Sequence, residues 1–404
     1  MAEPAPAAEA LAPLEWAPAD LESGAAPAEM LSLLERAAAG GSAPPAFLLR
    51  LAAIKLHRYD HAGALDAYAA VLAREPDERS AALGAARCLL ALERPREALD
   101  VLSGLEPDAA VLLLSGTARP ALGDDASAEA DLRTALAVQP SHSHALWRLN
   151  KLLRRQGRQA ELLALCERLY EAGVDHTQLL YDWGAALARA GEDDRARAIL
   201  FRPERVVRQR LAPPAEFGSA AAFNDALADE LLSAPVRLRE FPSAEQANRG
   251  SERVHSLLMG RRPELIQALV QRLEAAVSAC LLPRLGAFDP WLDARPRRVR
   301  LQPWGLIQRG GAYEAWHLHR GGWMSGVYYV EVPDGVTTDG DGAGCIEFGL
   351  PRSLLRDRPD LADDWRHAPR PGDLLLSPSH FPHRTIPTGQ DAHRISFAFD
   401  VVPA

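Results

Sequence analysis

The chain has 404 residues, of which 48% are hydrophobic and 25% charged, and its formal net charge is −9. This composition is typical of globular proteins, and the length exceeds one ordinary core, so we expect two domains. The acidic balance argues against nucleic acid as a partner, because phosphate binding needs a basic face. No apolar run reaches the ~18–20 residues of a membrane span, which argues against a membrane protein.

The first 27 residues are rich in proline and alanine. Acidic residues stand where a signal peptide would carry basic ones, and no continuous apolar segment follows. We therefore predict a flexible leader over residues 1–27.

The four cysteines are far apart in the sequence and form no Cys-x-x-Cys pair. This usage suits a reducing compartment and weighs against a zinc finger or a disulfide framework. We expect a cytoplasmic protein.

Residues 28–205 are predicted to be helical and internally repeated. Small residues recur at intervals of 34, 30, 32 and 36, at Ala64, Ala98, Ala128, Ala160 and Ala196. Four positions after each of these come Tyr68, Leu102, Leu132, Ala164 and Leu200, and Pro76, Pro107 and Pro140 close the first three units. A period near 34, with small residues where helices cross and proline after the second helix, indicates a helix-turn-helix solenoid.

This pattern resembles tetratricopeptide repeats, with Gly116 and Gly184 at a position where that family often has a small residue. A generic α-bundle is the alternative. The resemblance implies a concave face that binds a peptide, a protein or another copy of the chain, so a homodimer is compatible with it.

A boundary is expected at 206–215, "VVRQRLAPPA", which we interpret as a linker. The oxygenase-like domain described below would then span 216–404. Its first part, 216–290, holds two amphipathic segments, "FNDALADELLSA" (223–234) and a longer one over 262–283.

After Pro290 the pattern changes to short apolar or alternating runs broken by glycine, proline and aspartate. These runs are "RRVRLQPWGLIQRGG", "WMSGVYYVEVP", "GCIEFGLP", "DLLLSPS" and "HRISFAFDVV". They predict an antiparallel β-sandwich or barrel over 295–402, with helices beside it. The predicted fold class is therefore α+β and multidomain: a helical solenoid followed by a β-roll with flanking helices.

Six of the twelve histidines fall between residues 317 and 393. In an extended strand, residues i and i+2 point to the same face, so His317 and His319 could both face the interior. His383 follows another strand, and Arg394 with Ser396 lies on the next one. An arginine beside a serine is suited to gripping a carboxylate.

Residues 302–402 resemble the Fe(II)/2-oxoglutarate-dependent oxygenase superfamily, which is built on a double-stranded β-helix. The resemblance implies that His317, His319 and His383 bind Fe(II), while Arg394 and Ser396 bind the far carboxylate of 2-oxoglutarate. No catalytic residue is expected beyond the metal ligands.

Position 319 departs from the superfamily, which has an acid there to complete two histidines and one carboxylate. His319 could replace the carboxylate as a ligand, or it could contact a metal ligand without binding the metal itself. It could also be the first ligand, with Glu347, Asp400 or water completing the site, and Glu314 is a further spare acid. We favour the three histidines together.

The reaction implied by the resemblance consumes O2 and 2-oxoglutarate and hydroxylates an unactivated C–H bond. A solenoid joined to an oxygenase suggests a peptide or protein substrate. No GxSxG, P-loop or dinucleotide fingerprint supports another enzyme class. Two alternatives stay open, a three-histidine cupin-type dioxygenase that uses no 2-oxoglutarate, and an interaction scaffold without catalysis.

Overall fold

The computed structural model describes residues 13–21, 28–41, 43–239, 247–282, 284–350, 352–361, 365–389 and 391–404. The internal contacts divide the chain into a repeat unit, residues 24–174, and a β unit, residues 1–23 with 175–404. Within the described ranges, no helix is both long enough and apolar enough to cross a membrane. The predicted fold class, a tetratricopeptide-like helical region followed by a β-roll, is confirmed.

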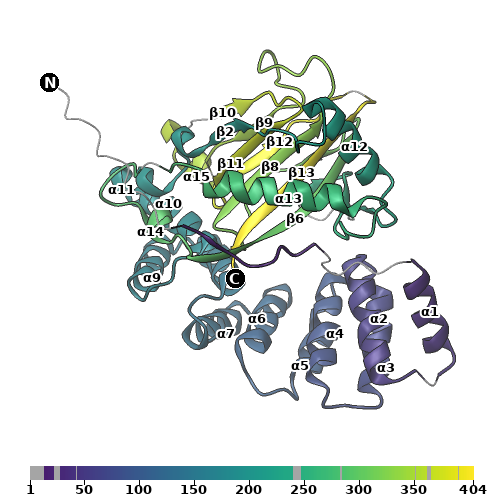
Figure 1. Cartoon of the computed structure of the whole chain (residues 1–404). Coiled ribbons are helices and arrows are strands. Elements are labelled where there is room, and N and C mark those ends of the chain that lie inside the picture. The colour runs from purple at the N-terminus through teal and green to yellow at the C-terminus, as the bar shows by residue number, and fades with distance from the viewer. Residues whose placement is uncertain are drawn as a thin grey trace. The chain divides into compact units, whose positions relative to one another are not determined.

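The repeat unit is a row of helices in which each packs on the next along the chain (Figure 1). They are α1 (Ala28–Ala39), α2 (Pro45–His57), α3 (His61–Leu72), α4 (Arg79–Ala91), α5 (Pro95–Leu102), α6 (Ala109–Ala118), α7 (Asp125–Val138), α8 (Ser143–Arg155) and α9 (Gln159–Glu171). Local signals start several of them. Asp60, Asp108 and Asp124 accept backbone N–H groups as N-caps, and proline opens α2 and α5.

The repeat register is more regular than the alanine spacing suggested. Ala160 is exposed, and the equivalent buried position in α9 is Leu162, so the assignment of Ala160 was wrong. The fourth residues of α3, α5, α7, α9 and α11 (Asp193–Ile199) are all at most 1% exposed, and they are Ala64, Ala98, Ala128, Leu162 and Ala196. In α9 this buried place is taken by a leucine, where the other four helices have alanine.

Gly116 shows why small residues recur in the first helix of each pair. A Cβ atom added there would lie 2.8 Å from Cγ of Leu132 on the next helix. At Gly184, in α10 (Thr177–Ala190), the corresponding neighbour is Leu200, at 3.1 Å. These glycines let neighbouring helices approach more closely than a side chain would allow.

The β unit contains an eight-stranded sheet with the order β2-β11-β8-β13-β6-β5-β3, to which β1 adds by parallel pairing with β6. Its strands are β1 (Glu15–Trp16), β2 (Val207–Arg210), β3 (Leu238–Arg239), β5 (Glu252–Val254), β6 (Arg298–Arg309), β8 (Met324–Glu331), β11 (Asp373–Pro378) and β13 (His393–Pro403). Smaller sheets are formed by β10 (Trp365–His367), β9 (Ile346–Phe348) and β12 (His383–Thr385), and by β4 (Asn248–Arg249) with β7 (Tyr313–Glu314).

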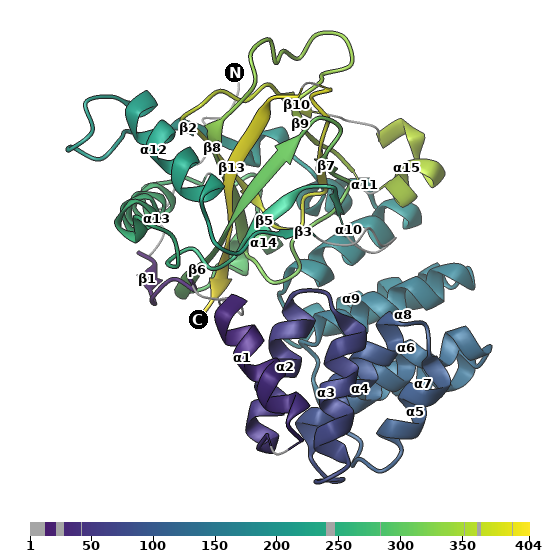
Figure 2. The same ribbon diagram turned by 90° about the vertical axis from the view of Figure 1, so that its right-hand side faces the viewer.

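Helices cover one face of the large sheet, and the smaller sheets lie on its other side (Figures 1 and 2). The covering helices are α12 (Ala220–Leu232) and α13 (Pro263–Ser278), and the hydroxyl of Tyr328 on β8 donates to Asn224 on α12 at 2.6 Å. The remaining helices of the β unit are α10, α11, α14 (Pro290–Asp293) and α15 (Arg352–Asp357).

Residue alternation along β13 divides the two faces of the sheet. Ile395, Phe397, Phe399 and Val401 are fully buried, while the intervening residues from Arg394 to Ala398 line a cavity on the opposite face. The period-two pattern of the sequence therefore sets which side chains reach the site.

Three expected boundaries differ from the structure. Residues 175–205, expected in the repeat region, belong to the β unit, where Arg320 donates to the buried Gln178 of α10 at 2.8 Å. The expected linker 206–215 contains β2, because the backbone of 207–210 pairs with β11. In the expected leader, 1–12 and 22–27 lie outside the described residues. The segment between them is not a free leader, because the N–H groups of Glu15, Ala17 and Asp20 donate to carbonyls of residues 297–301.

His380 is a buried histidine that does not face the cavity. Its Nε2–H donates to the carbonyl of Ile199 at 2.8 Å, and its buried Nδ1 has no hydrogen-bond partner among the described residues. Burial lowers the pKa of His380 to about 4. The unfolded chain therefore binds a proton here more readily than the folded one as the pH falls below ~6.5.

We predict that Gly116→Val destabilises the repeat unit by about 1–3 kcal/mol, because the added methyl groups would overlap Leu132. Calorimetric unfolding measures the effect. Gly104→Val is the matched control, since a Cβ atom at Gly104 meets nothing within 4 Å. Equal stability of the two variants would contradict the close approach.

We predict that His380→Gln makes the β unit less sensitive to acid. In the wild type, the unfolded chain takes up a proton at His380 as the pH falls from 6.5 to about 4, while the folded protein does not. This difference lowers the free energy of unfolding by up to about 3 kcal/mol. Glutamine can keep the hydrogen bond to Ile199 but does not titrate. Denaturant unfolding followed by tryptophan fluorescence at several pH values measures the difference, and parallel pH profiles would contradict it.

Candidate metal centre and its cavity

His317 and His383 are brought together by the backbone. The N–H of each donates to the carbonyl oxygen of the other at 3.0 Å, forming an isolated antiparallel bridge. His383 also pairs with Phe348 in the neighbouring strand β9. This pairing fixes the two Cα atoms before any side-chain interaction contributes.

His319 lies beyond the regular part of the strand. The segment was expected to be a strand through both histidines, but β7 ends at Glu314, and His319 is held by its N–H bond to the carbonyl of Ser379 at 3.0 Å. His317 and His319 nevertheless line the same cavity, as their i, i+2 spacing predicted.

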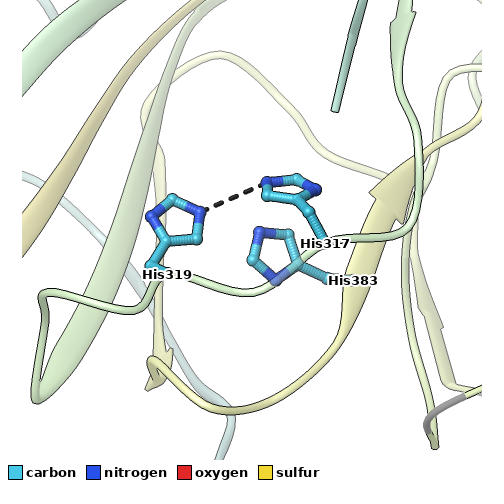
Figure 3. Close-up of side chains that lie close together, drawn as sticks. All are labelled: His317, His319 and His383. Atoms are coloured by element: carbon cyan, nitrogen blue, oxygen red, sulfur yellow. Dashed lines mark hydrogen bonds between the residues drawn. The ribbon is translucent and has the colours of Figure 1, made fainter. Parts of the chain in front are cut away.

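Figure 3 shows the three imidazole rings converging. One ring nitrogen of each histidine lies within 4.8 Å of those of the other two, and Nε2 of His317 is 3.3 Å from Nε2 of His319. The centroid of the His383 ring is 4.3 Å from that of His317 and 5.1 Å from that of His319. Among the described residues, this is the group whose geometry could hold a metal ion.

The outward nitrogen of each ring is occupied by an acceptor. Nδ1 of His317 donates to the carbonyl of Ala315 at 2.7 Å, and Nδ1 of His383 donates to that of Phe381 at 3.0 Å. Nδ1 of His319 lies 2.7 Å from the Asp400 carboxylate. Since these oxygens can only accept, each neutral ring carries its proton on Nδ1 and keeps a lone pair on Nε2.

Burial favours the neutral forms of His317 and His383. It lowers the pKa of His383 to about 3, with a smaller contribution from nearby His319. It also places the pKa of His317 well below its usual range, and the neighbouring His383 and His319 act in the same direction. Neutral imidazoles have the free lone pair that a metal requires.

The three spare acids lie outside the converging nitrogens. Glu347 is buried and accepts from Arg384 at 2.6 Å on the outer side of β9 and β12. Glu314 lines the cavity but pairs with Arg253 at 3.1 Å. Asp400 bonds to the rear of the His319 ring.

Arg394 and Ser396 line the same cavity as the histidines, and both are 3% exposed. Arg394 lies over the ring of Tyr329, 5.4 Å from its centroid, and its Nη2 is 3.4 Å from the Tyr329 hydroxyl. Its buried Nε has no hydrogen-bond partner, and no carboxylate among the described residues forms an ion pair with Arg394. A buried guanidinium without a counter-ion is costly unless an anion binds there.

The cavity has a volume of about 630 Å³, which includes space open to solvent. Most of its wall is apolar or aromatic, formed by Trp304, Leu306, Val327, Ile346, Phe348 and Leu375. A mainly apolar wall with a few converging polar groups is typical of small-molecule sites.

The aromatic residues near the site divide between the cavity wall and the core. Trp304 lines the cavity, whereas Trp323 is core, where its ring stacks on that of Trp291 at 5.0 Å. Tyr329 faces the cavity and Tyr328 the helices. Only the period-two alternation within "GVYYV" could have pointed to Tyr329.

The residues present fit both Fe(II) and 2-oxoglutarate. The Nε2 atoms of His317 and His319 are 3.3 Å apart. When both rings are neutral with their protons on Nδ1, two lone pairs face each other, and a cation bound by both would stabilise this arrangement. Arg394 supplies the unpaired positive charge that a dicarboxylate needs.

Residues 302–400 match the family described as "Putative 2OG-Fe(II) oxygenase", and residues 55–111 match a tetratricopeptide repeat family. The chain therefore combines an N-terminal region that matches tetratricopeptide repeats with a C-terminal domain that matches the putative 2OG-Fe(II) oxygenase family. The match to this family implies Fe(II) and 2-oxoglutarate, but the three-histidine group differs from the usual pair of histidines and one acid. No curated protein matches the chain.

Solved structures resemble each region separately. A prolyl-4-hydroxylase of Pseudomonas putida is 17% identical, with a TM-score of 0.33, over 54% of this chain and 98% of its own. A thermophilic tetratricopeptide repeat protein of Thermus thermophilus is 26% identical, with a TM-score of 0.33, over 39% of this chain and 89% of its own. At these TM-scores the likenesses carry no argument beyond the family matches.

We predict that His383→Ala weakens Co(II) binding by about 100-fold or more, since each ligand of a metal site contributes roughly 3 kcal/mol. Anaerobic Co(II) titration, followed by absorbance, measures the affinity. His367→Ala is the control, because His367 lies outside the converging group. Stoichiometric, tight binding in His383→Ala would contradict the site.

Proposed function

We propose that the protein is an Fe(II)- and 2-oxoglutarate-dependent oxygenase that hydroxylates a C–H bond of a peptide or protein. The observation that carries this proposal is the buried Arg394, which has no carboxylate partner among the described residues and lies in the same cavity as three converging imidazoles. A metal-binding group alone would fit many enzymes. The Arg394 guanidinium can bind a carboxylate in the same cavity. Together the two groups favour an enzyme that uses a metal ion and an acidic cosubstrate.

In this proposal, His317, His319 and His383 hold the metal through Nε2. Their Nδ1–H bonds to backbone carbonyls and to Asp400 fix the ring orientations, so little reorganisation accompanies metal binding. When bound, Fe(II) and 2-oxoglutarate together supply the oxidising chemistry, in which O2 and 2-oxoglutarate are converted to succinate, CO2 and the hydroxyl group of the product.

Arg394 binds the far carboxylate of 2-oxoglutarate through its guanidinium, and Ser396 adds a hydroxyl two residues along the same face of β13. The Tyr329 ring beneath the guanidinium limits its motion, and the Tyr329 hydroxyl lies close enough to be a third donor. The apolar wall around these groups lowers the local dielectric constant, which strengthens the charge interaction.

The repeat region supports a peptide or protein as the substrate, because stacked helix pairs present extended binding surfaces. The name of the oxygenase family gives no substrate. None of the four cysteines, all of which lie in the described part of the chain, forms a disulfide, and we propose the reducing cytoplasm as the compartment in which the enzyme works.

A second candidate follows from the ligand set itself. Three imidazoles without a carboxylate would also suit a dioxygenase that uses no 2-oxoglutarate. In that enzyme Arg394 would serve the substrate, and 2-oxoglutarate would not bind to the metal-loaded protein.

We predict that Arg394→Ala raises the Kd for 2-oxoglutarate about 30- to 1,000-fold, from the loss of roughly 2–4 kcal/mol of charge-assisted hydrogen bonding, while the metal affinity is retained. The Kd of Arg394→Lys should lie between those of the wild type and Arg394→Ala, because lysine keeps the positive charge but lacks the planar guanidinium that binds a carboxylate with two hydrogen bonds. The measurement is an anaerobic 2-oxoglutarate titration of the Fe(II)-loaded protein, followed by its visible charge-transfer band.

Arg300→Ala is the matched control, since Arg300 is exposed on the neighbouring strand β6. Metal binding without any 2-oxoglutarate band in the wild type would favour the second candidate. No metal binding at all would contradict both and favour a scaffold without catalysis.

A further inference from the structure

Asp400 is the acidic residue in direct contact with the candidate metal centre. Its Oδ1 lies 2.7 Å from Nδ1 of His319, and both side chains are 12% exposed. Asp400 lies on β13, paired in register with Ser325 on β8 and Gln302 on β6. Its backbone is therefore held on both sides by the middle of the sheet.

The carboxylate of Asp400 is fixed by a chain of hydroxyl groups. Ser325 Oγ donates to Asp400 Oδ1 at 2.6 Å, and the hydroxyls of Ser325 and Ser379 are 2.7 Å apart. A Cβ atom at Gly322 would lie 2.5 Å from Ser379 Oγ and 3.2 Å from Cβ of Asp400. The cluster is packed so closely that Asp400 has little freedom to turn toward the cavity.

The ring of His319, like the Asp400 carboxylate, is held in one orientation by its neighbours. It stacks on Trp304 with centroids 5.6 Å apart and on His383 with centroids 5.1 Å apart, each at an interplanar angle of 22°. With Nδ1 directed at Asp400, Nε2 faces Nε2 of His317. The imidazole therefore lies between the carboxylate and the metal position.

We propose that Asp400 is a positioning residue that, acting through His319, supplies the negative charge which the three-imidazole ligand set lacks. The inference rests on the proposed metal site. In the usual ligand set the carboxylate binds the metal itself. Here it bonds to the rear of a ligand ring, which fixes the tautomer and raises the basicity of Nε2, as in other carboxylate–histidine–metal arrangements.

The test compares Asp400→Asn with wild type, because asparagine keeps an oxygen acceptor for Nδ1–H but removes the charge. We expect the Kd for Fe(II), measured anaerobically, to rise about 10- to 100-fold. We also expect the Fe(III)/Fe(II) midpoint potential of the bound iron to rise. The Asp400 carboxylate stabilises Fe(III) more than Fe(II), and the variant lacks that negative charge. A purely structural role would not shift the potential in that direction.

Asp373→Asn is the matched control. Asp373 lies 3.3 Å from His367, both side chains are 15% exposed, and neither belongs to the converging group. This variant should leave the iron affinity and potential unchanged. Wild-type affinity and potential in Asp400→Asn would overturn the inference but leave the proposed function standing, whereas a wild-type protein that binds no iron would overturn the proposed function and the inference with it.

A measurement on the metal-free wild-type protein keeps the inference testable if Asp400→Asn fails to fold. Long-range ¹H–¹⁵N NMR, with His319→Gln to assign the signals, should find the proton of His319 on Nδ1. A proton on Nε2 would overturn the inference. Ser325→Ala, which removes the hydroxyl donor to Asp400 but keeps the charge, should weaken iron binding less than Asp400→Asn does.

Discussion

The reciprocal backbone hydrogen bonds between His317 and His383 are the interaction on which the site depends. They join two segments that are far apart in the chain and place the ring centroids 4.3 Å apart. The Nδ1 bonds to Ala315 and Phe381 then fix how each ring is turned. Strand pairing and these hydrogen bonds therefore position the imidazole rings during folding. The binding of a metal then requires little further ordering of the protein.

Burial also explains how charges are distributed around the cavity. Glu314 and Glu347 are paired with arginines, and Asp400 is held by His319 and a serine hydroxyl. Arg394 is the contrasting case, with no carboxylate partner among the described residues. A protein retains such a buried charge at a cost, and a ligand of opposite charge removes that cost. The cavity is thus arranged for one cation and one anion.

The two units meet the same packing requirement by different means. In the repeat unit, Gly116 and the buried alanines let helices approach closely. In the β unit, alternation along β13 separates a fully buried apolar face from the face that lines the cavity. The β unit also incorporates Glu15–Trp16 and Val207–Arg210 as strands of its large sheet. Such segments have no strong local signal, because their strand structure comes from backbone pairing with a distant partner.

The sequence by itself determined the elements whose signals are local. The repeat period of the small residues and the prolines that close the units indicated the solenoid. The period of two placed His317 with His319, and Arg394 with Ser396, on common faces. Only the tertiary structure decided the relations that depend on distant pairing. These include the position of Asp400 behind His319 instead of among the converging nitrogens, the orientation of Tyr329 beneath Arg394, and the buried place of Leu162 where an alanine was expected. The reason is physical: periodicity fixes the face on which a side chain lies, but sheet register and packing decide which groups meet across it.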